Sequence, residues 1–184
     1  MTTRIDRGAR RGFIVLAVVI FALLAACWLV IQLSKATLDR ALDHPEHPLS
    51  DGQAKAQVLG AARQIAAIGH LQRRSAGYTL MSCKDEADPP YQGAVFMSFD
   101  LPSDAVGYYE NLAKALIARG WTEGPAPSRD MPGKTLSDNG VTAIFNRNGD
   151  DLHMGTVRVY GECRDVNDHR RDTTAWTDIS SELQ

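Results

Sequence analysis

Residues 13–33, FIVLAVVIFALLAACWLVIQL, form one long apolar segment that follows a basic N-terminus. A helix of these 21 residues rises about 1.5 Å per residue and would span roughly 31 Å, the thickness of a bilayer's hydrocarbon core. The four arginines that precede the segment are Arg4, Arg7, Arg10 and Arg11. Positively charged residues that flank a membrane-spanning segment stay on its cytoplasmic side. The sequence therefore predicts a cytoplasmic tail (1–12), a single-pass transmembrane helix (13–33) and an extracytoplasmic C-terminal part.

Cys27 supports a second interpretation of the same segment. Leu24-Ala25-Ala26-Cys27 resembles a bacterial lipobox, in which the cysteine is lipidated and becomes the first residue of the mature protein. Residues 28–31, WLVI, argue against this, because a polar tether usually follows a lipoprotein cysteine. The sequence favours an uncleaved signal anchor, and a lipoprotein processed at Cys27 is the alternative.

The charge distribution excludes one class of partner. Residues 1–12 carry a local charge of +3, whereas the rest of the chain has 16 basic and 21 acidic residues and a charge of −5. An acidic exported part lacks the clustered Lys and Arg typical of nucleic-acid binding. We therefore expect no nucleic-acid partner. The expected partners are the membrane itself and a protein of the cell envelope.

Fifteen Arg against five Lys is a composition typical of high-GC bacteria.

The other two cysteines, Cys83 and Cys163, both lie in the exported part. An even pair in an oxidising compartment is most simply a disulfide. On the loop-entropy model, closing a loop of about 80 residues stabilises a fold by roughly 4–5 kcal/mol. A structural disulfide is predicted; a metal pair and two free thiols are the alternatives.

Two helices are expected in an exported α+β domain at residues 50–164. A stalk at residues 34–49 precedes them, and its prolines disfavour helix. Ser50 and Gln53 have the spacing of a capping box, which begins a helix that ends near Gly69. Ser103 is predicted to cap a second helix, which Gly120 terminates.

The remaining periodicity predicts a single antiparallel sheet packed with these helices. Alternating residues mark strands at 78–83, 94–99, 134–136, 141–145 and 152–163. Asn139-Gly140 is the signal of a type I′ hairpin. Residues 165–184 are interpreted as a polar C-terminal tail, in which Trp176 and Ile179 could dock.

No catalytic, cofactor or metal motif is recognisable in the chain, so a binding or interaction domain is the main functional hypothesis. Aromatic residues dominate interface energies. The candidate partner contacts are Tyr91, Tyr108, Trp121 and Trp176. An envelope hydrolase that uses carboxylates or His153 is the alternative. A helix dimer through Ala22 and Ala26 fits the small-residue spacing but has no other support.

Overall fold

The computed structural model describes residues 16, 19–33, 42–84, 87–172 and 176–183, in two compact units, residues 1–44 and 45–184. The predicted tail (1–12), part of the apolar segment (13–15 and 17–18) and most of the predicted stalk (34–41) lie outside the described residues. In the first unit, residues 19–33 are α-helical. Among the residues that the structure describes, no helix combines the length and the apolar character needed to cross a bilayer.

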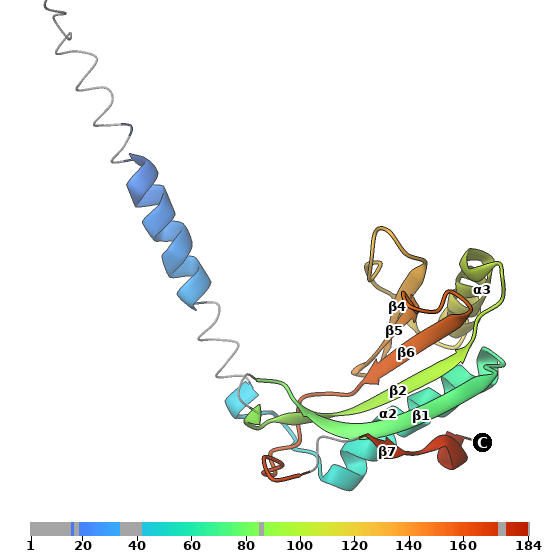
Figure 1. The fold of residues 1–184 in the computed structure, drawn as a ribbon. Helices are drawn as coiled ribbons and strands as arrows, with labels where there is room; N and C mark the ends of the chain where they lie inside the picture. Colours follow the sequence, from blue (N-terminus) through green and yellow to red (C-terminus); the bar gives the residue numbers. More distant parts are fainter. Residues whose placement is uncertain (1–15, 17–18, 34–41, 85–86, 173–175, 184) are drawn as a thin grey trace, which may run out of the picture. The chain divides into compact units, whose positions relative to one another are not determined.

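The second unit is built on one seven-stranded antiparallel sheet with the strand order β3-β4-β5-β6-β2-β1-β7 (Figure 1). In chain order the strands are β1 (Arg73–Ser82), β2 (Tyr91–Asp100), β3 (Thr122–Glu123), β4 (Gly133–Asp138), β5 (Val141–Arg147), β6 (Met154–Tyr160) and β7 (Thr177–Asp178). The predicted α+β class with a single antiparallel sheet is confirmed. Strand β1 begins earlier than predicted because it pairs with β2 from Arg73↔Phe99 to Ser82↔Tyr91.

Helix α2 (Asp51–Ile68) begins and ends as the sequence predicts. The Ser50 backbone N–H donates to Gln53 Oε1 at 2.9 Å, and the Gln53 N–H donates to Ser50 Oγ at 3.4 Å. This reciprocal capping box satisfies two N–H groups that have no partner inside the helix. Gly69 is the C-cap.

Helix α3 (Ala105–Ile117) is capped by Asp104, so the prediction of Ser103 as the cap is wrong. The Asp104 carboxylate accepts a hydrogen bond of 2.9 Å from the Gly107 N–H. An N-cap side chain must reach an N–H two or three residues further along, which Asp104 does here. A carboxylate also interacts favourably with the positive end of the helix dipole.

Both helices pack on the same face of the sheet (Figure 1), where residues of the longer strands β1, β2, β4, β5 and β6 enter one apolar core. Phe145, Val157 and Val159 are fully buried there. The chain after residue 164 also contributes to this core, because Ile179 is 0% exposed and Leu183 in the 3₁₀ helix η2 (Ser180–Leu183) is 3% exposed. Ile179 and Leu183 of the predicted polar C-terminal tail (165–184) therefore pack into the core of the domain.

Cys83 and Cys163 form the predicted disulfide, with an S–S distance of 1.99 Å and a Cα–Cα distance of 6.0 Å. Cys83 directly follows β1, and Cys163 lies shortly after β6. The bridge joins the end of β1 to the start of the C-terminal segment.

Gly93 allows α2 to lie close to β2. A Cβ atom at this position would lie 2.6 Å from the backbone oxygen of Ala54, which cannot move without shifting the helix. Gly93→Ala is expected to lower the free energy of unfolding by about 1–3 kcal/mol through overpacking. Denaturant unfolding measures the change.

Gly60→Ala is the matched control for this prediction. Nothing lies within 4 Å of an added Cβ at Gly60, which is an exposed position inside α2. Alanine should raise stability there by about 0.5–1 kcal/mol, because glycine is entropically costly in a helix interior. Equal effects of the two substitutions would contradict the close approach of α2 to β2.

Candidate functional site

Two of the four predicted contact aromatics are buried. Tyr91 and Trp121 are each 3% exposed, and the Trp121 indole N–H donates to Gln64 Oε1 at 2.9 Å. Tyr108 is half-buried and donates its hydroxyl to the Gly69 carbonyl at 3.1 Å. Tyr91 and Trp121 are therefore corrected to core residues. Both residues lie beside predicted loops in the sequence. That position does not show that the apolar core reaches the ends of the sheet, where the two side chains are buried.

Trp176 is 45% exposed and lies on the face of the sheet opposite the helices. Directly paired residues share a face of a sheet, so Gly77 and Phe96 lie together on this side. The Trp176 ring packs on both: its centroid is 6.1 Å from that of Phe96, and its Cβ occupies the space above Gly77.

Trp176 separates two hollows of the surface. One has a volume of about 400 Å³ and includes Ser75, Phe96 and Asp178 in its lining. The other has a volume of about 320 Å³ and includes Met81 and His169. An exposed indole between two hollows is a candidate contact surface, which we call the Trp176 face.

A second feature is a cluster of carboxylates around one histidine. Asp51 is the first residue of α2, while Asp165 and His169 come from the segment that follows β6. Asp165 is held by its backbone, since its N–H donates to the Tyr91 carbonyl at 3.1 Å and its carbonyl accepts from the Tyr91 N–H at 2.6 Å. This pairing lies at the start of β2, close to the residues that precede α2.

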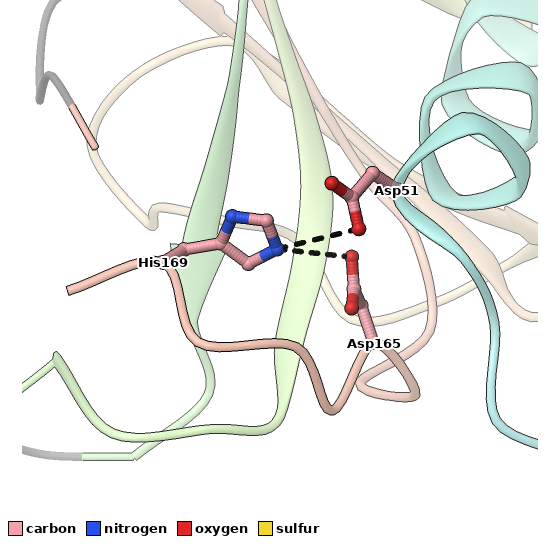
Figure 2. A group of neighbouring side chains, drawn as sticks. All are labelled: Asp51, Asp165 and His169. Atoms are coloured by element: carbon pink, nitrogen blue, oxygen red, sulfur yellow. Dashed lines mark ion pairs between the residues drawn. The ribbon is translucent and has the colours of Figure 1, made fainter. Parts of the chain in front are cut away.

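The side chains of Asp51, Asp165 and His169 converge (Figure 2). His169 Nε2 lies 3.4 Å from Asp165 Oδ2 and 3.5 Å from Asp51 Oδ1. On the other side of the ring, His169 Nδ1 lies 2.7 Å from Asp172 Oδ2. The three facing atoms lie within 4.8 Å of one another, and this set could hold a metal ion.

Neighbouring groups fix the orientation of these side chains. The Asn167 side-chain amide donates to Asp51 Oδ1 at 2.6 Å, and the Asn167 backbone N–H donates to Asp165 Oδ1 at 3.0 Å. The Tyr91 and His169 rings meet edge to face, with centroids 4.9 Å apart. Asp165 Oδ2 and His169 Nε2 are buried without a hydrogen-bond partner.

The cluster perturbs the pKa values of its members. Burial raises the pKa of Asp165 above its ordinary value, partly offset by the Asn167 N–H. The hydrogen bond from Asn167 lowers the pKa of Asp51. Burial acts to lower the pKa of His169, but the hydrogen bond to Asp172 and the nearby carboxylates outweigh it, so the pKa is raised. The carboxylates around His169 thus favour the positively charged form of its imidazole.

Sequence reasoning missed this cluster because Asp51 is far from Asp165 and His169 along the chain. A local signal is present in residues 165–172, DVNDHRRD, where Asp165 and Asp172 flank His169 at short spacing.

His153, the acid–base candidate of the enzyme alternative, is exposed in a turn. Its backbone N–H donates to Asp151 Oδ1 at 2.9 Å.

Comparison with known proteins places the chain in a family. The family model described as "Putative lipoprotein LppJ" matches residues 50–182. The chain belongs to the LppJ family. Relatives with this same name in Mycobacterium tuberculosis (strains H37Rv and CDC 1551 / Oshkosh) and in Mycobacterium bovis are 40% identical over 169 residues, covering 91% of this chain and 89% of theirs. No solved structure matches.

The family match includes both the cluster and the Trp176 face. Residues 50–182 contain all the strands, helices α2 and α3, Asp51, Asp165, His169 and Trp176. The name of the relatives describes a lipoprotein and names no reaction.

Proposed function

We propose that this chain is a lipid-anchored protein of the bacterial cell envelope, acylated at Cys27, whose α+β domain binds a protein partner outside the cytoplasmic membrane. The observation that supports the anchor is the lipobox-like Leu24-Ala25-Ala26-Cys27 in a chain whose relatives are named as lipoproteins. Cys27 is exposed and forms no disulfide. The basic N-terminus and the apolar residues up to Ala26 then act as the export signal.

The apolar residues after Cys27 fit this proposal if they lie at the membrane boundary. Trp28 is 64% exposed, and Leu29, Val30 and Ile31 are each more than half exposed. Trp is enriched at membrane–water interfaces, and a single acyl chain alone gives only reversible binding. Residues 28–33 would therefore strengthen the attachment that the acyl chains provide. The alternative is an uncleaved signal-anchor helix with its N-terminus in the cytoplasm.

The Trp176 face is the surface that we propose for the partner. Tryptophan is enriched among residues that dominate binding energy. Both the 400 Å³ and the 320 Å³ hollow are lined by Trp176, so partner side chains could enter on each side of the indole. Of the four aromatic contacts that the sequence suggests, Trp176 has the exposure that this role requires.

The lipid anchor predicts a defined mature product. Expressed in a mycobacterial host, the chain should lose residues 1–26 and carry acyl mass on Cys27, as measured by intact mass spectrometry of the purified membrane fraction. Cys27→Ser should abolish both the cleavage and the acyl mass, because no thiol is left to acylate. An unprocessed wild-type chain beginning at Met1 would overturn the lipoprotein proposal and support the signal anchor.

The Trp176 face predicts that one substitution weakens partner binding selectively. Trp176→Ala should raise the Kd for the cross-linked envelope partner by about 30-fold, which corresponds to a loss of about 2 kcal/mol at an interface hot spot. Cross-linking in cells identifies the partner, and titration of the purified pair measures the Kd.

Val106→Ala is the matched control for the partner experiment. Val106 is an apolar residue of α3, is 59% exposed and lies on the helical side of the domain. Its substitution should leave the Kd unchanged. A Trp176→Ala variant that binds as tightly as the wild type would overturn the proposed contact surface.

A further inference from the structure

We propose that Asp51, Asp165 and His169 form a binding site for one divalent transition-metal cation of the Zn²⁺ type. The proposal rests neither on the anchor nor on partner binding at the Trp176 face, although His169 also lines the smaller hollow beside Trp176. Its ligands would be Nε2 of His169 and one carboxylate oxygen each from Asp51 and Asp165. Imidazole nitrogen and carboxylate oxygen are both common ligands of Zn²⁺, whereas Ca²⁺ and Mg²⁺ favour oxygen alone.

Two buried polar atoms point into the site and have no hydrogen-bond partner. Asp165 is 0% exposed, and the side chain of His169 is 8% exposed. Asp165 Oδ2 and His169 Nε2 face each other and Asp51 (Figure 2). Buried polar atoms are nearly always paired in native proteins, because an unpaired group loses its hydration without compensation. A bound cation would satisfy both atoms at once.

The spacing of the facing atoms suits a shared metal better than a direct ion pair. A charge-assisted N–H···O bond measures about 2.7–2.9 Å. The distances from His169 Nε2 to Asp165 Oδ2 and Asp51 Oδ1 are 3.4 and 3.5 Å. Two ligands of a tetrahedral zinc ion, each about 2.0–2.2 Å from the metal, are roughly 3.3–3.5 Å apart. The separations thus match those of two neighbouring ligands on one ion.

The charge balance also favours a cation. Asp51, Asp165 and Asp172 surround the single imidazole of His169. Within the described part of the chain, none of these carboxylates has an ion pair with Lys or Arg. Asp165 is 0% exposed, and burying a carboxylate without a cationic partner is costly. A divalent ion would neutralise the two carboxylates that face it.

Surrounding residues would support such a site. Asp172 accepts from His169 Nδ1 at 2.7 Å, which leaves Nε2 free to coordinate. Histidine ligands of metals usually donate the other ring N–H to a carboxylate in this way. Asp51 is on the solvent side, with its side chain 55% exposed, so an ion can enter there. The fourth position would be open to water.

Zinc titration of the chain, purified in detergent and stripped with a chelator, tests this proposal. Isothermal titration calorimetry should show one Zn²⁺ per wild-type chain, and the melting temperature should rise because the ion binds the folded state. His169→Ala and Asp51→Asn should each weaken binding by about 100-fold or more. Asp172→Asn should weaken it by about 10–100-fold, as loss of an outer hydrogen-bond partner does. Because Asp51 is exposed, Asp51→Asn tests the site without disturbing the core.

His153→Ala is the control, because it removes an exposed histidine from a turn outside the cluster. It should bind Zn²⁺ like the wild type. Titration with Co²⁺ provides a second readout, since a tetrahedral Co²⁺ site absorbs visible light strongly. Failure of the wild type to bind Zn²⁺, or binding unchanged by both His169→Ala and Asp51→Asn, would overturn the proposal.

Discussion

The fold depends on a closure at one end of the sheet, where the C-terminal segment is tied back to β1 and β2. The Cys83–Cys163 disulfide is one tie. Two backbone hydrogen bonds between Tyr91 and Asp165, of 2.6 and 3.1 Å, are another. The Leu49 N–H donates to the Arg164 carbonyl at 2.8 Å, which brings in the residues before α2. Segments distant in sequence thus meet at the point where the carboxylate–histidine cluster forms.

Much of the secondary structure follows from local sequence signals. The capping box of Ser50 and Gln53 sets the start of α2 because its hydrogen bonds join residues three apart. Asn139 and Gly140 both have positive φ, 45° and 78°, as a type I′ turn requires, so the β4–β5 hairpin forms where predicted. The prediction of Ser103 as the cap of α3 is wrong by one residue, because the neighbouring Asp104 has a side chain that can also cap a helix.

The carboxylate–histidine cluster could not be predicted because it depends on contacts between distant residues. Asp51 and Asp165 resemble any surface aspartates until the closure brings them together. Tyr91 and Trp121 lie near predicted loops, but tertiary packing buries them. The short strand β7 pairs with β1 at Gly77↔Asp178 and Tyr78↔Thr177 alone, which is too little for periodicity to reveal. The disulfide was predictable because it depends on cysteine number and compartment.

Native-state hydrogen exchange, compared between the wild type and the Cys83→Ser/Cys163→Ser double variant, tests the closure most directly. The Asp165 amide is the probe, and the Val157 amide of β6 is the internal reference. In the wild type both should exchange only through global unfolding. Without the disulfide, Asp165 should exchange by local opening, much faster than Val157. An Asp165 amide that is unprotected in the oxidised protein, or equally protected with and without the disulfide, would contradict this account.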